Sequence, residues 1–197
     1  MNHLQFQASI GTIAITWNSL GKLTSVDWFG DCGVPGDAWS SIGRWQIPPV
    51  VSDLVERLRG YFERGEPMGE VPWEHIEQST WTDFQKQVYG AITQIPHGET
   101  RTYSWVACRI ANYTLTRAVG QALRKNPLPI LIPCHRVVSA TTLGGFMGST
   151  DPHLPELQLK QKLITLEEGY ISPMFSFLTT APHGNPSLTP GLTASSF

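Results

Sequence analysis

Residues 126–138 read NPLPILIPCHRVV, an apolar run of strand-like residues that ends in a cysteine held between a proline and a histidine. A cysteine among apolar residues usually behaves as a small, inert core residue. Here His135 follows Cys134 as a potential base and Arg136 adds a positive charge, and both favour the thiolate, the reactive form of the side chain. We therefore expect Cys134 to be an activated nucleophile.

Cys134 and His135 are neighbours in sequence, which limits how they can cooperate. On a strand, adjacent side chains point to opposite faces, so direct contact between them requires a turn at this point. A bridging water can carry the proton instead. A carboxylate on the far ring nitrogen would orient the imidazole, and Glu167, at the end of the last expected helix, is our candidate.

The chain has 197 residues, of which 41% are hydrophobic and 15% are charged, and its net charge is −2. This composition indicates a compact protein of one domain or two small ones and excludes global disorder. The charge is uneven, because residues 101–136 hold six basic and no acidic side chains, whereas the first 80 residues hold ten acidic and five basic ones. The basic segment favours a local anion-binding face, although a set of solvated helix faces gives the same pattern.

The three cysteines, Cys32, Cys108 and Cys134, are widely spaced and odd in number, which indicates neither a disulfide framework nor a zinc motif. We expect Cys108 to be structural, on the apolar side of its helix. The N-terminus lacks a signal-peptide pattern, and no apolar run approaches the roughly 20 residues that span a membrane. The expected location is the cytoplasm, or the nucleus in a eukaryote, with no membrane partner.

The first 80 residues are expected to form a small α/β domain. The alternating residues 4–17, a turn at 18–21 and residues 22–29 predict an antiparallel hairpin, followed by an irregular connection over 30–49. A helix is expected over 50–64, before Gly65. Its inward stripe comprises Val51, Leu54, Val55, Leu58 and Phe62.

Residues 81–171 are expected to form a second, mainly helical domain. Thr82 is a plausible N-cap for a helix over 84–94, and the following turn places His97 in an exposed position. Two short helices over 103–110 and 116–123 match the helix-turn-helix pattern, whose second helix enters a DNA groove. A glycine-rich loop over 143–148 and a helix over 157–166 follow, and residues 172–197 are expected to be a flexible tail.

Several motifs, in this order, resemble the O6-alkylguanine-DNA alkyltransferases, also called methylated-DNA–protein-cysteine methyltransferases. They are IPHGET at 95–100, RAVG at 117–120, NP at 126–127, PCHRV at 133–137, LGGF at 143–146, and Lys160, Leu163 and Glu167. The resemblance covers about residues 81–170; the N-terminal half agrees only in size and in the order of strands and helix. It implies a ribonuclease-H-like α/β N-terminal domain and a mainly α C-terminal domain with a helix-turn-helix.

The resemblance implies direct-reversal DNA repair: the alkyl group on guanine O6 moves irreversibly to Cys134, once per molecule. His135 would be the water-bridged base, Glu167 its orienter, and Tyr103 the residue that helps to protonate the leaving guanine. No cofactor is implied. Some relatives carry zinc in the N-terminal domain, but His3 and Cys32 do not reproduce its ligands, so no metal is expected.

The implied partner is double-stranded DNA that carries O6-alkylguanine, bound through its minor groove by a monomer that flips the nucleotide out of the duplex. Arg117 would fill the vacated stack, and the small Ala118 and Gly120 would let their helix approach the duplex. Thr102 and Arg124 complete the expected DNA-contacting set. The expected substrate pocket comprises Asn126, which bonds the backbone of the active-site turn, and Pro129, Val137, Phe146, Met147 and Gly148.

Three other readings remain open. The loop after Cys134 is slightly shorter than is usual in the family and a longer segment precedes Lys160, which keeps open a non-catalytic, alkyltransferase-like lesion-binding protein; such relatives lack the cysteine. A Cys-His hydrolase would need an oxyanion hole and a separately placed histidine, and no matching set is visible. A sequence-specific regulator would use long arms or dimer symmetry, which are not visible either.

Overall fold

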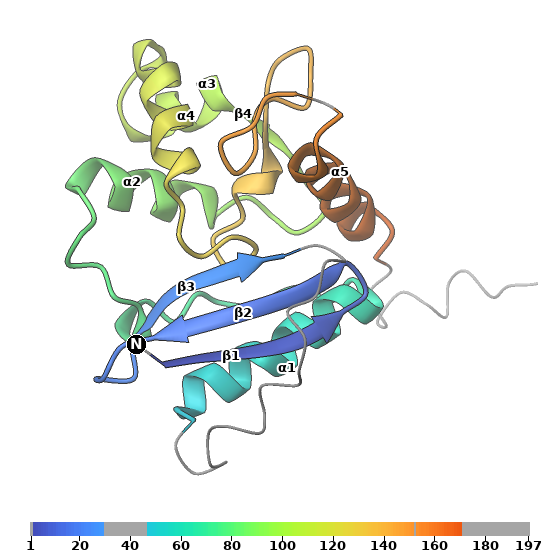
Figure 1. The fold of residues 1–197 in the computed structure, drawn as a ribbon. Coiled ribbons are helices and arrows are strands. Elements are labelled where there is room, and N and C mark those ends of the chain that lie inside the picture. The colour runs from blue at the N-terminus through green and yellow to red at the C-terminus, as the bar shows by residue number, and fades with distance from the viewer. Residues whose placement is uncertain (1, 30–46, 152, 171–197) are drawn as a thin grey trace, which may run out of the picture.

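The computed structural model describes residues 2–29, 47–151 and 153–170. Its N-terminal part is an antiparallel sheet in the order β1 (Asn2–Ala8), β2 (Gly11–Trp17) and β3 (Leu23–Trp28), with α1 (Pro49–Arg64) packed on the sheet (Figure 1). The hairpin expected over 4–29 is confirmed between β2 and β3. The single strand expected over 4–17 is wrong, because the chain reverses before Gly11, whose φ of 124° favours glycine. The alternating pattern runs through both strands and hides this turn.

Helix α1 buries the predicted stripe on the sheet side. It ends at Gly65, which adopts the left-handed conformation with φ 70° and donates its N–H to the carbonyl oxygen of Tyr61 at 2.9 Å. A Cβ on Gly65 would lie 3.0 Å from the backbone oxygen of Leu166, so the two chain segments approach closely here. The end of α1 is therefore held against the end of α5 (Pro155–Glu168).

The second part is mainly helical, as predicted. Thr82 forms a capping box with Gln85 at the start of α2. The helices α3 and α4 contact each other and α2, with the short η4 between them, and form the expected helix-turn-helix (Figure 1). The elements are η3 (Trp73–His75), α2 (Asp83–Ile92), β4 (Arg101–Thr102), α3 (Tyr103–Ile110), η4 (Tyr113–Leu115), α4 (Thr116–Arg124), η5 (Cys134–Arg136), β5 (Val137–Val138) and α5 (Pro155–Glu168).

The strand-like reading of residues 128–133 is wrong. The chain turns there with Ile130 at φ 74°, a rare conformation for a β-branched residue, and continues into η5. Asn126 holds this turn: its side-chain oxygen accepts from the N–H of Leu128 at 3.1 Å, and its amide donates to the carbonyl of Ile132 at 2.8 Å. Prolines at 127, 129 and 133 lack the N–H donors that a strand needs, which explains the failure.

The two parts share one continuous cluster of buried apolar residues. The N–H of Val26, on β3, donates to the carbonyl oxygen of Pro127 at 2.8 Å, so the turn before Cys134 rests on the edge of the sheet. Most of the connection over 30–49, Cys32 and the tail from 172 lie outside the described residues. None of the helices within these described ranges combines the length and the apolar composition that a membrane span requires.

Candidate active site

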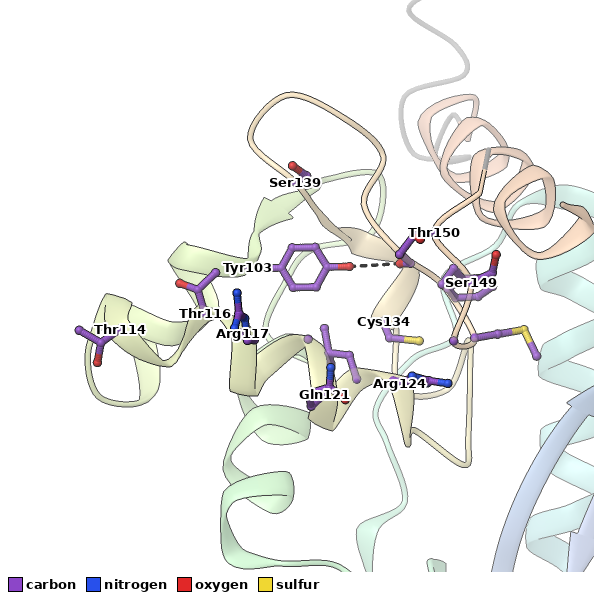
Figure 2. A pocket seen from close by; sticks show the side chains of 16 residues that line it. Tyr103, Thr114, Thr116, Arg117, Gln121, Arg124, Cys134, Ser139, Ser149 and Thr150 are labelled. Atoms are coloured by element: carbon purple, nitrogen blue, oxygen red, sulfur yellow. Dashed lines mark hydrogen bonds between the residues drawn. The ribbon is translucent and has the colours of Figure 1, made fainter. Parts of the chain in front are cut away.

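Cys134 lies at the inner end of a cavity of about 660 Å³ (Figure 2). Its side chain is 7% exposed, and Sγ accepts a hydrogen bond from the side-chain amide of Asn126 at 3.2 Å. Residues 134–136 form a 3₁₀ turn, in which successive side chains point about 120° apart, so Cys134 and His135 need not face opposite ways as on a strand. Asn126 therefore contacts the thiol in addition to the backbone turn.

His135 is fully buried, and its Nε2 lies 2.7 Å from Oε1 of Glu167 on α5. Glu168, the neighbour of Glu167, is exposed. An ionised carboxylate can only accept, so we assign the ring proton to Nε2 and the lone pair to Nδ1. Nδ1 is buried without a hydrogen-bond partner among the described residues. It is thus the nitrogen able to receive a proton.

The Glu167 carboxylate accepts from several further donors. They are the hydroxyl of Tyr61 at 2.8 Å, Nε and Nη2 of Arg136 at 2.8 and 3.1 Å, and the N–H of Gly98 at 3.1 Å. Burial alone would raise the pKa of Glu167, but the hydrogen bonds and charges of His135 and Arg136 hold that pKa well below its usual range. Glu167 is therefore ionised throughout the physiological pH range.

The expectation that Arg136 supplies positive charge to the thiolate is wrong. Its guanidinium pairs with Glu167 and donates to the carbonyl of Ile95 at 2.8 Å, because the 3₁₀ turn directs it toward α5. The cation near the thiol is Lys160, whose fully buried ammonium donates to the carbonyls of Val137 at 2.6 Å and Gly145 at 3.0 Å. Sequence reasoning matched Lys160 as a motif but gave it no role, although a lysine between apolar helix positions was a signal.

The thiol and the imidazole are both neutral at rest. Burial raises the pKa of Cys134, against the hydrogen bond from Asn126 and the charge of Lys160. Burial lowers the pKa of His135, against the pull of Glu167. Burial also lowers the pKa of Lys160 to about 8. Activation of the thiol therefore requires a proton transfer during the reaction rather than a standing thiolate.

A glycine-rich loop over residues 143–148 forms one wall of the cavity that contains Cys134. Tyr103, at the start of α3, donates its hydroxyl to the carbonyl of Gly145 at 3.1 Å (Figure 2). A Cβ on Gly144, at φ 71°, would lie 2.8 Å from the Tyr103 ring, and one on Gly148, at φ 90°, would lie 3.1 Å from Nε of Arg124. These two positions require glycine because the loop passes so close to α3 and α4.

Most of the expected DNA-contacting and pocket residues line this cavity. Arg117 is exposed on α4, and Figure 2 shows it with Arg124 along the same wall. Sequence reasoning missed other members of this lining, including the polar Gln121 of α4, because no motif marked them. The predicted residues on the lining are Tyr103, Arg117, Gly120, Arg124, Cys134, Phe146, Met147 and Gly148.

Other expected residues lie outside the lining. Thr102 caps α3 by accepting from the N–H of Trp105 at 3.1 Å, and Ala118 is half-buried on α4. Val137 and Pro129 are buried, and the carbonyl of Val137 already accepts from Lys160. None of these four residues is therefore part of the cavity surface.

Two smaller expectations are wrong. The His97 side chain is 13% exposed rather than exposed in a turn, because it packs beside Glu167 and accepts from Nη2 of Arg136 at 3.3 Å. Cys108 is exposed, since α3 turns Val106 and Ala107 inward instead.

Among the described residues, no cluster of three histidine, cysteine or acidic side chains is arranged to hold a metal ion.

The family model described as "6-O-methylguanine DNA methyltransferase, DNA binding domain" matches residues 83–169. The methylated-DNA–protein-cysteine methyltransferase of Methanosarcina acetivorans is 43% identical over 86 residues, which are 44% of this chain and 51% of that protein. The chain thus spans about half the length of that relative. The enzyme of the same name from Mycolicibacterium paratuberculosis is 37% identical over 130 residues, 65% of this chain and 72% of that protein.

The fold is similar to a solved structure as well. The crystal structure of Mycobacterium tuberculosis OGT in complex with DNA superposes with a TM-score of 0.62 at 28% identity, and covers 85% of this chain and 93% of that one. Coverage of this size takes in both the sheet and the helical part. The similarity therefore extends beyond the residues that the family model matches.

Proposed function

The chain belongs to the methylated-DNA–protein-cysteine methyltransferase family, and on that basis we propose that it repairs DNA by direct reversal. The alkyl group of O6-alkylguanine moves onto Cys134, one turnover per molecule. The observation that carries this proposal is a thiol at the inner end of a cavity, next to a buried His135–Glu167 pair. The other residues of the site then take roles in the same transfer.

The first step is proton removal from the thiol. His135 accepts the proton through Nδ1, with a water between the two side chains, and Glu167 stabilises the resulting imidazolium. The thiolate that forms is stabilised by the Asn126 amide and by the Lys160 ammonium. A base held in this way makes a buried thiol with a raised pKa reactive only once the substrate is in place.

The second step is an in-line displacement at the alkyl carbon. The Cys134 sulfur forms the new carbon–sulfur bond while the bond from that carbon to guanine O6 breaks, and guanine leaves with the electron pair. Tyr103 lines the cavity and donates to the Gly145 carbonyl; it turns this hydroxyl toward O6 to protonate the departing base. Tyr103 then regains a proton from solvent while the His135 imidazolium releases the thiol proton to solvent, so both side chains return to their neutral forms and the net proton transfer is from the thiol to guanine.

The partner is double-stranded DNA containing O6-alkylguanine, bound through its minor groove by a monomer with the target nucleotide flipped out. The exposed Arg117 on α4 enters the vacated stack, and Gly120 and Arg124 face the same cavity. Ala118 and Thr102 flank that surface. A cavity of about 660 Å³ has room for a flipped base with its alkyl group.

The organisation of the chain completes the proposal. Residues 1–80 form a ribonuclease-H-like α/β domain and residues 81–171 the DNA-binding and alkyl-acceptor domain, followed by the tail over 172–197. The protein acts in the cytoplasm, or in the nucleus of a eukaryote. A hydrolase is disfavoured because the N–H of Cys134 donates to the carbonyl of Ile132 at 2.8 Å, which removes it as an oxyanion donor.

The test is the variant Cys134→Ala, assayed for methyl transfer from, and binding to, a duplex with one O6-methylguanine. We expect transfer to be abolished and binding to be nearly unchanged, because Cys134 is 7% exposed and contributes little contact surface. A wild-type protein that binds the lesion without transfer would instead support the lesion-binding function. Loss of binding together with transfer in the variant would give the cysteine a structural role.

A further inference from the structure

Tyr61, on α1 in the N-terminal part, reaches the pair behind the cysteine. Its side chain is completely buried, and its hydroxyl donates to Oε1 of Glu167 at 2.8 Å. The same hydroxyl oxygen lies 3.4 Å from Nε2 of His135. A residue 106 positions before Glu167 in the sequence thus touches both members of the pair.

We propose that Tyr61 is a positioning residue for alkyl transfer, which fixes the Glu167 carboxylate and through it the tautomer and orientation of His135. This inference rests on the proposed function. According to this proposal, the N-terminal part positions side chains of the active site, in addition to contributing residues to the common apolar core.

Three polar atoms form a triangle, namely Nε2 of His135, Oε1 of Glu167 and the hydroxyl oxygen of Tyr61. The phenol of Tyr61 has one proton, which it donates to Glu167, so it offers only a lone pair to His135. Nε2 of His135 therefore faces two acceptors, Oε1 at 2.7 Å and the phenol oxygen at 3.4 Å. Both are satisfied only when Nε2 carries the proton. The lone pair is then held on Nδ1, where the proposed reaction needs it.

The position of Tyr61 is rigid. Gly65, one turn further along α1, packs against the backbone oxygen of Leu166 with no room for a side chain. The Tyr61 ring also makes edge-to-face contacts with Phe62 and with the imidazole of His97. The end of α1 and the end of α5 are therefore locked together at the level of Glu167.

Tyr61 also competes with His135 for one carboxylate oxygen. The groups that face His135 are Glu167 and Lys160 from α5, Arg136 from its own turn, Tyr61 from α1, and, behind the carboxylate, His97. Glu167 favours the imidazolium, whereas Arg136 and Lys160 disfavour it. Without the phenol, the Glu167 carboxylate interacts more strongly with His135, which stabilises the imidazolium and raises the pKa of His135. As the pH falls, the neutral base is then lost at a higher pH.

The test compares Tyr61→Phe with a matched control, Tyr89→Phe. Tyr89 is also completely buried, but its hydroxyl donates to the carbonyl of Ala122 at 3.0 Å instead of to Glu167. Single-turnover transfer is measured against pH with free O6-methylguanine base and with the lesion duplex. For Tyr61→Phe we expect the transfer rate to fall by roughly two- to tenfold on both substrates, which is the effect expected from the loss of one hydrogen bond. The affinity for the duplex should be unchanged. In the plot of transfer rate against pH, the acidic limb of Tyr61→Phe should lie at higher pH than that of the wild type. The acidic limb of Tyr89→Phe should coincide with that of the wild type.

A second pair of variants tests the route of the effect. In a Glu167→Gln background, the further change Tyr61→Phe should alter the rate much less than in the wild type, because both act through one carboxylate. Equal effects in the two backgrounds would overturn the proposal. So would a Tyr61→Phe protein with the wild-type rate and pH profile, given an active wild type. An inactive wild type would instead contradict the proposed function itself.

Discussion

Behind Cys134 the charged and polar side chains are buried and paired, whereas at the mouth of the cavity they are exposed. Glu167 and Lys160 are 3% and 0% exposed, and their polar atoms form hydrogen bonds with residues of α1, η5 and the glycine-rich loop. Arg117 and Arg124 on α4 are exposed instead and line the cavity (Figure 2). In the proposed function this difference separates two tasks: the buried side prearranges the chemistry, and the exposed side binds the nucleic acid.

The largest effect is expected on the buried side. His135→Asn removes the proposed base, so the rate of methyl transfer should fall by about 10²-fold or more. The loss should be the same for free O6-methylguanine and for the duplex, because His135 is fully buried and cannot contact DNA. Single-turnover kinetics on both substrates measure it. A variant that loses activity on the duplex alone would break the separation of the two sides.

An intermediate effect is expected at the mouth. Arg117→Ala should slow transfer from the duplex by roughly tenfold or more, because the vacated base stack is no longer filled and extrusion of the nucleotide costs a few kcal/mol. Its rate with the free base should stay near that of the wild type. Arg109→Ala is the matched control, since Arg109 is exposed on α3 and outside the cavity lining. Equal losses of Arg117→Ala on the two substrates would contradict a role in base flipping.

The smallest effect concerns stability and separates Lys160 from the exposed cations. Its pKa is lowered from 10.5 to about 8 by burial, so between these values the unfolded chain binds more protons than the folded protein. As the pH rises from 8 to 10.5, the free energy of unfolding of the wild type should therefore increase relative to that of Lys160→Met. Urea unfolding of both proteins at several pH values measures this change in the difference. A constant difference across this range would mean that Lys160 is not desolvated.

The sequence allowed several of these features to be predicted because their causes are local. The capping of α2 by Thr82, the stop of α1 at Gly65 and the two helices of the helix-turn-helix follow from neighbouring residues, and the structure has all three. The pairing of Arg136 could not be predicted, since its direction depends on a 3₁₀ turn that the apolar run concealed. The contact of Tyr61 depends on how α1 docks against α5, which no local pattern encodes.

Tertiary packing also explains why the predictions of an exposed His97 and a structural Cys108 were wrong. Whether a turn or a helix face is exposed depends on what packs against it, and His97 is covered by the charges that gather around Glu167. Cys108 lies on the opposite side of α3 from the buried Val106 and Ala107. Tertiary packing decided both positions, so composition and periodicity were insufficient.

The central claim, that Cys134 accepts an alkyl group from DNA once per molecule, is tested most directly by intact-protein mass spectrometry. The protein is incubated with a duplex that contains one O6-methylguanine, and the modified peptide is then mapped. We expect the mass of a single methyl group, saturating at one per protein and located on the peptide that bears Cys134. A protein that stays unmodified, or that carries the methyl group on another residue, would contradict the account.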